Sequence, residues 1–335
     1  MHILVLRLSA LGDVAMTIPA VYSVARAHPE HCFTMVTSAF TARLFINPPS
    51  NVDVLALGKE ERRGTMGTIR MIGRLRKLSV DAVADLHNVM RSWLVSTYFR
   101  LQGKTVAMLD KHRTERRAIL RNHAEVAVPF VQRYFEVFAR LGLKATPQFT
   151  SLFPASLPPL PDNLPAKATE EWIGIAPFAR YRSKTYDKEQ MQKVVTMLAA
   201  MPRGRIFLFG ARGAEEKLLQ EWAEKRPNVF VVAGRLQLEE ELALMAHLDV
   251  MISMDSANMH LASLVGTRVI SIWGGTTPAC GFLGYAQHRE DALMAGLPCQ
   301  PCSIAGSDRC PLGHFRCTQS ITPEAIVSHF KDTAI

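Results

Sequence analysis

The chain has 335 residues, of which 48% are hydrophobic and 21% are charged, a length and composition typical of two soluble globular domains. It contains no run of about 18 apolar residues, which excludes an ordinary membrane-spanning helix. The net charge of +9 is uneven: residues 1–160 have 21 Lys and Arg against 11 Asp and Glu (+10), and the remainder has 18 against 19 (−1), so the first half should meet an anionic partner.

The amino terminus begins with an apolar run that resembles a short signal peptide. It lacks the basic region and the small-residue cleavage site, so we interpret it as a buried strand and expect a cytoplasmic protein. Apolar runs rich in β-branched residues then alternate with segments of helical periodicity. We expect strands at residues 2–8, 32–37, 52–57, 81–86 and 104–109. This alternation predicts parallel strands joined by crossover helices.

A proline-rich stretch interrupts the pattern near residue 160 and is typical of an interdomain linker. The alternation then resumes. We expect strands at 172–177, 205–210, 228–234, 249–254 and 267–273, with helices near 188–201, 213–226, 238–247 and 257–265.

The predicted fold class is α/β, with two tandem doubly wound, Rossmann-like domains facing a central cleft. Ligands of such sheets bind at the carboxyl ends of the strands, so the loops that follow the strands are where catalytic and binding residues are expected. The predicted division is a first domain at 1–155, a linker at 156–170, a second domain at 171–320 and a closing helix at 321–335.

The first candidate site residue is Asp13, in the segment RLSALGDVAMTIPA after the first strand. A strand that ends in a glycine-containing turn before a helix presents this carboxylate at the predicted cleft. Asp13 therefore fits a catalytic base, and it fits equally well a residue that caps the helix by accepting its first amides. Neither this turn nor any later one contains G-x-G-x-x-G, which argues against a dinucleotide cofactor, and we expect no cofactor.

A second group of candidates lies in SMDSANMHLASLVGTRVISIWGGTTP (253–278). Asp255 and Ser256 follow a strand, and the helix after them directs its free amides and positive dipole end toward a ligand such as a diphosphate. Small residues from Gly274 to Thr277 follow the next strand and allow close backbone approach to a ligand. The alternatives are a helix cap at Asp255 or Ser256 and a core histidine at His260.

A third group follows the first strand of the second domain, in APFARYRSKTYDKEQ (176–190). Arg180, Arg182 and Lys184 place positive charge beside the predicted phosphate site, which suits a leaving diphosphate. Each of them singly also fits a solvated loop charge. Lys184 is the strongest candidate.

Together these segments resemble glycosyltransferase family 9, the ADP-heptose:lipopolysaccharide heptosyltransferases. The similarity rests on RLSALGDVAMTIPA, on Ser183-Lys184, and above all on D-S-x-x-x-H-L-A followed by G-x-T-x-P. The resemblance implies a GT-B fold, inversion at the anomeric carbon and no catalytic metal. It implies an ADP-sugar donor, ADP-heptose, held by the second domain, and an inner-core lipopolysaccharide acceptor, Kdo or heptose, held by the first.

The resemblance also implies roles for individual residues. Asp13 would be the general base, and Lys184 would contact the donor diphosphate. The implied donor-binding residues are Ala179, Arg180, Asp255, Ser256, Ala257, Asn258, His260, Gly275 and Thr276. The chain departs from the family at Ala257, where glycine is usual, and at Asn258, where proline or leucine is commoner. These departures leave the exact donor sugar open.

The positive charge of the first half is concentrated in two segments, 62–77 and 111–121. We expect them to bind the carboxylates and phosphates of the acceptor and to hold the enzyme at the anionic inner membrane, although a solvated helix face is an equal alternative. The candidate acceptor-binding residues are Arg62, Arg63, Arg91, Lys111, Arg113 and Arg117.

Four of the six cysteines cluster near the carboxyl end, at Cys299, Cys302, Cys310 and Cys317. One C-x-x-C with two further thiols is compatible with a structural zinc site, but the second pair is spaced too widely for the usual motif, so reduced thiols or a disulfide are favoured and no metal is expected.

Two other function classes remain. A nicotinamide oxidoreductase should contain a glycine-rich fingerprint, which this sequence lacks. A basic nucleotide-binding module at a membrane surface would not need the phosphate-type turns of the second half. Within transferases, another nucleotide sugar or another glycan acceptor is the main alternative.

Overall fold

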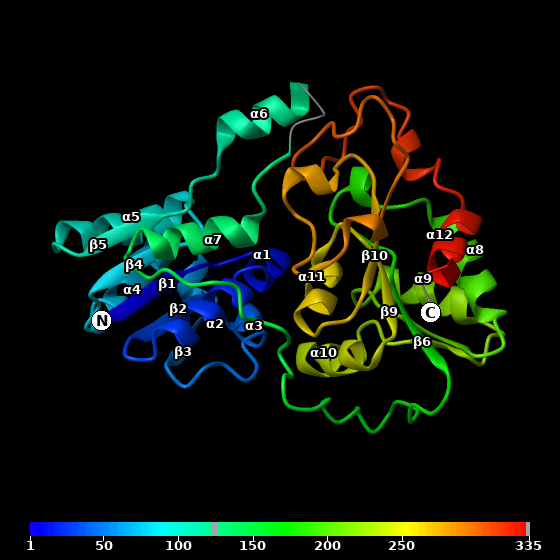
Figure 1. Ribbon diagram of the computed structural model, residues 1–335, viewed down its shortest axis with the longest axis horizontal. Helices are drawn as coiled ribbons and strands as arrows, with labels where there is room; N and C mark the ends of the chain where they lie inside the picture. The colour runs from blue at the N-terminus through cyan, green and yellow to red at the C-terminus, as the bar shows by residue number, and fades with distance from the viewer. Residues whose placement is uncertain (122–125, 333–335) are drawn as a thin grey trace. The chain divides into compact units, whose positions relative to one another are not determined.

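The computed structural model describes residues 1–121 and 126–332 and divides into two compact units. Unit 1 comprises Met1–His112 and Val128–Leu152, and unit 2 comprises Arg113–Ala127 and Phe153–Ile335. Each unit contains one parallel sheet with helices on both faces (Figure 1), which confirms the predicted fold class. In the part of the chain that the structure describes, no helix has both the length and the hydropathy to cross a bilayer.

The sheet of unit 1 has five parallel strands in the order β3-β2-β1-β4-β5. Its strands are β1 (His2–Leu6), β2 (Cys32–Ser38), β3 (Val52–Leu57), β4 (Ala82–Asp85) and β5 (Thr105–Met108). The helices of unit 1 are α1 (Leu11–Ala15), α2 (Ile18–Ala27), α3 (Ala39–Ala42), α4 (Gly64–Leu75), α5 (Met90–Leu101) and α7 (Phe130–Ala139). A 3₁₀ turn, η1 (Glu60–Arg62), precedes α4. The five strands expected from the sequence are confirmed.

Both faces of this sheet are buried, which explains why its strands are continuous apolar runs. Side chains alternate along a strand, so Leu4 and Leu6 pack with Met71 and Leu75 of α4 on one face. The opposite face carries Phe33, whose ring lies 6.3 Å from that of Phe138 on α7. Helices α2 and α7 contact each other.

The sheet of unit 2 has six parallel strands in the order β11-β10-β9-β6-β7-β8. Its strands are β6 (Glu171–Ala176), β7 (Gly204–Leu208), β8 (Val229–Val231), β9 (Val250–Met254), β10 (Val269–Trp273) and β11 (Ala292–Met294). Its helices are α6 (Arg113–Arg121), α8 (Lys188–Ala199), α9 (Ala214–Ala223), α10 (Leu238–His247), α11 (Ala257–Leu264) and α12 (Pro323–Asp332). The five expected strands are confirmed, and β11 was not predicted because three residues are too few to show a period.

A single apolar cluster fills one face of this sheet. It joins strand residues such as Ile175 and Ile252 to Val194 of α8, Trp222 of α9 and Phe330 of α12. The carboxyl-terminal helix thus packs on the sheet of unit 2, next to α8. Residues 333–335 of the predicted closing helix lie outside the described residues.

The assignment of residues 1–155 to a single domain is wrong for one segment. Residues 113–121 and 126–127 group with unit 2, because the buried Ile119 of α6 packs with Ala127 and Cys280 and with the partly buried Phe282 and Ile304. The Ala127 amide also donates to the carbonyl of Ala279 at 2.7 Å. An amphipathic helix packs where an apolar surface accepts its one hydrophobic face, and sequence order does not say which unit offers that surface.

Candidate functional site

In an open parallel sheet, the position of the ligand site is predicted by the point at which the strand order reverses. In unit 2 the chain runs from β6 outward to β7 and β8, and then returns to β9 on the other side of β6. Ligands of open parallel sheets bind beyond the carboxyl ends of the strands at such a reversal. The loop after β6 carries Lys184, and the turn after β9 carries Asp255. Two of the predicted site residues are therefore brought together by the topology.

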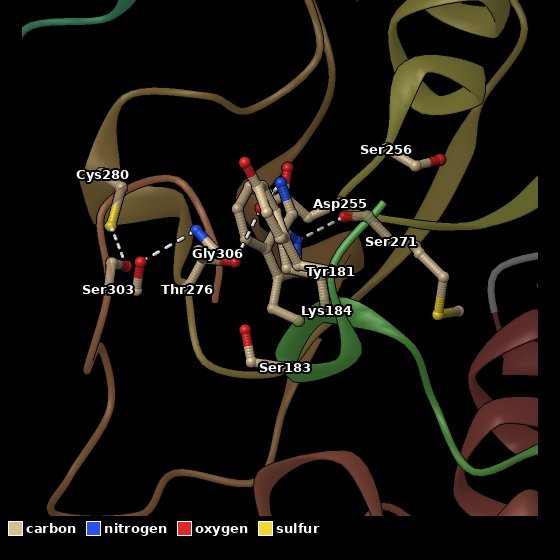
Figure 2. A network of polar contacts seen from close by, with 12 residues as sticks. Tyr181, Ser183, Lys184, Asp255, Ser256, Ser271, Thr276, Cys280, Ser303 and Gly306 are labelled. Carbon is tan, nitrogen blue, oxygen red and sulfur yellow. Dashed lines mark hydrogen bonds and ion pairs between the residues drawn. The ribbon is translucent and has the colours of Figure 1, made fainter. Parts of the chain in front are cut away.

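Lys184 and Asp255 form an ion pair, with 2.8 Å between Nζ and Oδ2. The same Oδ2 accepts a hydrogen bond from the Thr276 hydroxyl at 2.6 Å (Figure 2). The side chains of Lys184 and Asp255 are only 15% and 3% exposed. An ion pair removed from water to this degree fixes the position of the ammonium group and leaves two of its three protons for other acceptors.

The Lys184 loop is held by backbone contacts with the turn after β10. The Gly275 amide donates to the Ser183 carbonyl at 2.6 Å. At Gly274 an added Cβ would collide with that same carbonyl oxygen, which explains the absence of a side chain there. The glycines of the G-x-T-x-P segment are thus required by close packing of two backbones, and Thr276 supplies the hydroxyl that reaches Asp255.

The cysteine-rich loop covers the other side of the Lys184 loop, which the sequence did not predict. Ser307 donates its amide to Ser183 Oγ at 2.9 Å, and the Ser183 amide donates to the Ser307 carbonyl at 3.0 Å. Gly306, with φ at +98°, lies against the aliphatic stem of Lys184, where a Cβ would stand 2.5 Å from Cδ. Figure 2 shows Gly306 and Tyr181 beside Lys184. The only sequence signal for this contact is the run of small residues Ala305 to Ser307.

The remaining predicted donor residues occupy the rim and the interior of the same region. Ser256 is the residue before α11, and its side chain makes no capping bond to the helix, while Ala257 and Asn258 form the first helical positions. His260 is buried on this helix. Arg180 is exposed on the loop after β6, following the half-buried Ala179, and its guanidinium lies over the Tyr181 ring at 5.3 Å.

In unit 1 the strand order reverses between β1 and β4, so the corresponding ligand position lies beyond these two strands. Asp13 follows β1, in the first turn of α1. It is not the N-cap residue, but its carboxylate reaches back to the Ala10 amide at 3.3 Å. The same oxygen pairs with Arg7 Nη2 at 2.8 Å, and the Asp13 side chain remains 34% exposed. Asp13 thus combines a capping contact with a solvent-accessible carboxylate.

Arg7 was not predicted as a site residue, because in the sequence it is a single cation within an apolar run. Its Nη1 donates to the Leu86 carbonyl at 2.7 Å and its Nε to the Ser9 carbonyl at 3.1 Å. Burial lowers the pKa of this guanidinium, and the neighbouring Tyr134, Asp13 and Asp85 more than offset that effect. Arg7 is therefore a buried permanent cation that orients the Asp13 carboxylate.

His87 and Asp85 are the other titratable groups at this strand end. Burial, followed by the charge of Arg7, lowers the pKa of His87 to about 3, so its imidazole is neutral near pH 7. Asp85 is fully buried and accepts hydrogen bonds from the His87 and Asn88 amides and from the Ser96 hydroxyl. Among these groups, Asp13 alone combines a carboxylate with solvent access.

The predicted acceptor residues are divided between the units. Arg62, Arg63, Arg91 and Lys111 belong to unit 1, whereas Arg113 and Arg117 lie on α6 in unit 2. Arg62 and Arg63 precede α4, which follows β3, and Arg91 is in the first turn of α5, which follows β4. Crossover connections place all three at the carboxyl edge of the sheet, the edge at which Asp13 lies.

All six cysteines are free thiols. Burial and the proximity of Cys302, Cys299 and Cys310 raise the pKa of Cys317 to about 11, whereas backbone amides lower the pKa of the half-buried Cys310. The Cys302 amide also donates to the Gly275 carbonyl at 3.0 Å. The cysteines thus form one cluster whose loop supports the turn after β10, and the expectation that this cluster holds no metal stays a prediction.

Comparison with known proteins shows which family the chain resembles in sequence. Residues 68–309 match the family model of glycosyltransferase family 9 (heptosyltransferase). The chain is 25% identical to lipopolysaccharide heptosyltransferase 1 of Pseudomonas aeruginosa, covering 90% of this chain and 86% of that one. It is 21% identical to lipooligosaccharide heptosyltransferase 2 of a Campylobacter jejuni strain of serotype O:6, covering 96% and 95%.

The fold is shared with solved structures. The structure of Escherichia coli heptosyltransferase WaaC with ADP-2-deoxy-2-fluoro heptose aligns over 100% of both chains, with a TM-score of 0.69 and 20% identity. The E. coli ADP-heptose lipopolysaccharide heptosyltransferase II aligns with a TM-score of 0.66 and 17% identity, covering 99% of this chain and 98% of that one. The family match includes β4 and β5 of unit 1 and all six strands of the unit 2 sheet, and with them Lys184, Asp255 and Thr276. The chain therefore belongs to glycosyltransferase family 9, the heptosyltransferases.

Proposed function

We propose that this glycosyltransferase moves a heptose from ADP-heptose to the inner core of lipopolysaccharide, with inversion at the anomeric carbon. The observation that carries the proposal is the buried Lys184–Asp255–Thr276 group at the strand reversal of unit 2, within the residues that match the family. In this proposal unit 2 binds the donor, and unit 1 supplies the base and contacts to the acceptor.

The donor contacts follow from the charge of an ADP-sugar. When the glycosidic bond breaks, its electron pair goes to the departing diphosphate oxygen, and negative charge grows there. Lys184 has protons available beyond the one shared with Asp255, and the first amides of α11 provide further donors at a positive helix end. Arg180 is exposed on the same loop and can pair with phosphate oxygens. These positive groups carry the role that a divalent cation plays in other transferases, so activity should persist in EDTA.

The acceptor hydroxyl must lose its proton as its oxygen attacks the anomeric carbon. Besides Arg7, the titratable groups described at the carboxyl ends of β1 and β4 are Asp13, Asp85 and His87. His87 is a weak base because its pKa is about 3. The Asp85 carboxylate is buried and already accepts three hydrogen bonds. Asp13 is accessible and oriented by Arg7, which supports it as the group that takes the proton.

The family names of the relatives and the charge of unit 1 support an anionic acceptor. Arg62, Arg63 and Arg91 lie at the edge of the sheet that carries Asp13, where they can pair with the carboxylate of Kdo or with core phosphates. The same positive charge supports a peripheral contact with an anionic leaflet.

A charge reversal tests the acceptor assignment. In Arg62→Glu/Arg63→Glu we expect the KM for the acceptor to rise by at least about tenfold, with a strong dependence on salt, while affinity for ADP changes little. The matched control is Arg76→Glu/Lys77→Glu, which makes the same charge change at the other end of α4, away from Asp13. An equal rise of KM in both variants would mean that only the overall charge of unit 1 matters.

Arg117 needs a separate variant because α6 belongs to unit 2. If Arg117 binds the acceptor as predicted, Arg117→Glu should raise the KM for the acceptor and leave that for the donor unchanged. A change confined to the donor KM would instead assign α6 to the donor site. Both kinetic constants are measured from ADP release under varied donor and acceptor concentrations.

The donor is tested by thermal stability in the presence of ADP-, GDP- and UDP-sugars. A ligand at about 100 times its Kd stabilises the folded protein by roughly 2.7 kcal/mol, which raises Tm by several degrees for a domain of this size. We expect ADP-heptose to give the largest rise. A larger shift with another ADP-sugar would show that Ala257 alters the sugar pocket, and a larger shift with a GDP- or UDP-sugar would contradict the proposed nucleotide.

A further inference from the structure

At the amino end of the unit 1 sheet, two histidines and a glutamate surround a common point. His28, Glu30 and His31 lie in the short loop between α2 and β2, and their three ligand atoms are all within 4.8 Å of one another. His28 Nδ1 lies 3.7 Å from Glu30 Oε1, and His31 Nε2 lies 3.4 Å from the same oxygen. The two imidazole rings are parallel, with centroids 5.8 Å apart.

These separations suit metal ligands better than hydrogen bonds. A hydrogen bond between such atoms would be about 2.7–3.2 Å long. Two ligand atoms on one tetrahedral zinc ion, each about 2.0–2.1 Å from the metal, stand about 3.3 Å apart. We propose that His28, Glu30 and His31 form a binding site for a transition-metal dication, with Zn²⁺ as the expected ion.

The tautomer of His28 supports this assignment. Its Nε2 lies 3.0 Å from the Lys144 carbonyl oxygen, which can only accept, so Nε2 carries the proton of the neutral ring. Nδ1 therefore presents its lone pair to the Glu30 carboxylate. The lone pair and the carboxylate thus face the same point, where both are available to a cation. A carbonyl that fixes the second ring nitrogen is also the usual outer contact of a histidine ligand.

The loop is held in place before any ion arrives. Asn51 Nδ2 lies within hydrogen-bonding distance of three carbonyl oxygens, those of Ala25, His28 and His31, at 2.9, 3.1 and 2.9 Å. The His31 amide donates to the His28 carbonyl at 3.1 Å, which closes the turn. The side chains of His28 and His31 are 20% and 18% exposed, and that of Glu30 is 61% exposed. The His28 ring is held at the Lys144 carbonyl, and His31 Nδ1 lies 3.3 Å from the amino-terminal nitrogen, while the carboxylate can adjust to an ion that enters from solvent.

The ligand set and its surroundings define the kind of ion. Two imidazoles and one carboxylate suit Zn²⁺, Ni²⁺ or Cu²⁺, whereas Mg²⁺ and Ca²⁺ prefer oxygen ligands throughout. The site also follows the carboxyl end of α2, where the negative end of the helix dipole favours a cation. Three protein ligands leave a fourth position for water.

The site is remote from the residues proposed for transfer within unit 1. The His28–His31 loop precedes β2, whose first residue pairs with His2 at the start of β1, while Asp13 follows the end of β1. The five residues of β1 separate the two ends of the sheet by roughly 16 Å. A bound ion would tie the loop after α2 to the segment at Lys144 and stabilise unit 1 without entering the reaction.

The test measures zinc binding by the full chain. Metal-stripped protein is titrated with Zn²⁺ in a calorimeter, and Tm is recorded with Zn²⁺ and, separately, with Mg²⁺. We expect the unaltered protein to bind one more zinc ion than His28→Gln/His31→Gln, which separates this site from any zinc held by the four cysteines. Saturating Zn²⁺ should raise Tm by several degrees more in the unaltered protein than in that variant, and Mg²⁺ should not.

Two further variants distinguish loss of the zinc site from a folding defect. Glu30→Gln changes one exposed side chain and keeps its shape, and it should weaken zinc binding at this site at least about tenfold while the far-ultraviolet circular dichroism stays unchanged. His112→Asn removes an imidazole that also lies near a carboxylate, that of Asp110, and it should leave the zinc stoichiometry intact. Equal numbers of zinc ions bound by the unaltered protein and by His28→Gln/His31→Gln would overturn the proposal.

Discussion

Asp13→Asn is expected to abolish almost all turnover while the protein folds and binds ADP-heptose normally. An amide oxygen can still accept the hydrogen bonds from the Ala10 amide and from Arg7, but it cannot take the proton of the acceptor hydroxyl. Loss of a general base typically lowers the rate by about 10²- to 10⁴-fold. The measurement is kcat from ADP release, together with Tm and the thermal shift with donor.

The contacts of Arg7 make this variant interpretable. Removing the Asp13 charge leaves the guanidinium with its bonds to the Leu86 and Ser9 carbonyls, so the buried cation keeps hydrogen-bond partners. Asp13→Ala is the matched comparison, because it also removes the capping contact and should lower Tm further at a similarly low kcat. If Asp13→Asn keeps substantial kcat, or is inactive only because it unfolds, Asp13 is a capping residue and the base lies elsewhere.

The second large effect is expected at Lys184. Its ammonium group should stabilise the departing diphosphate more strongly in the transition state than in the bound donor. Lys184→Ala should therefore lower kcat by roughly tenfold to a thousandfold, the range for loss of one such electrostatic contact. Asp255 complicates the single variant, since it would remain buried at 3% exposure without its counter-charge, which costs about 3–5 kcal/mol of stability.

A double variant separates catalysis from folding. Asp255→Asn removes the stranded charge and can still accept the Thr276 hydroxyl, so Lys184→Ala/Asp255→Asn should regain much of the Tm that Lys184→Ala loses. Its kcat should remain low, because the ammonium group is still absent. Recovery of kcat together with Tm would show that Lys184 acts only through the stability of the loop.

The candidate site could be predicted in part because its residues follow strands. Parallel strands end at one edge of a sheet, so Asp13, Lys184 and Asp255 could be assigned to strand-end loops from local periodicity alone. The residues with which they interact could not be predicted in this way. The ion pair between Lys184 and Asp255 depends on β6 and β9 being neighbours, and the strand order that makes them so is set by packing between segments distant in the sequence.

The same distinction applies to the supporting residues. Arg7, inside an apolar run, gave no local signal of its pairing with Asp13. The cysteine-rich loop likewise gave no local signal that its backbone holds the Ser183–Lys184 turn. Likewise, Asn51 comes within reach of the carbonyls of Ala25, His28 and His31 only when β3 pairs with β2.

The sequence by itself determined the two α/β sheets, the uneven charge and the strand-end loops that carry the candidate residues, because hydrophobic period and turn chemistry are local properties. Only the tertiary structure decided that α6 belongs to unit 2, that Lys184 is paired with a buried carboxylate, and that Arg7 orients Asp13. Each of these depends on which apolar and charged surfaces meet after folding. That outcome minimises the free energy of the whole chain and is not encoded in any one segment.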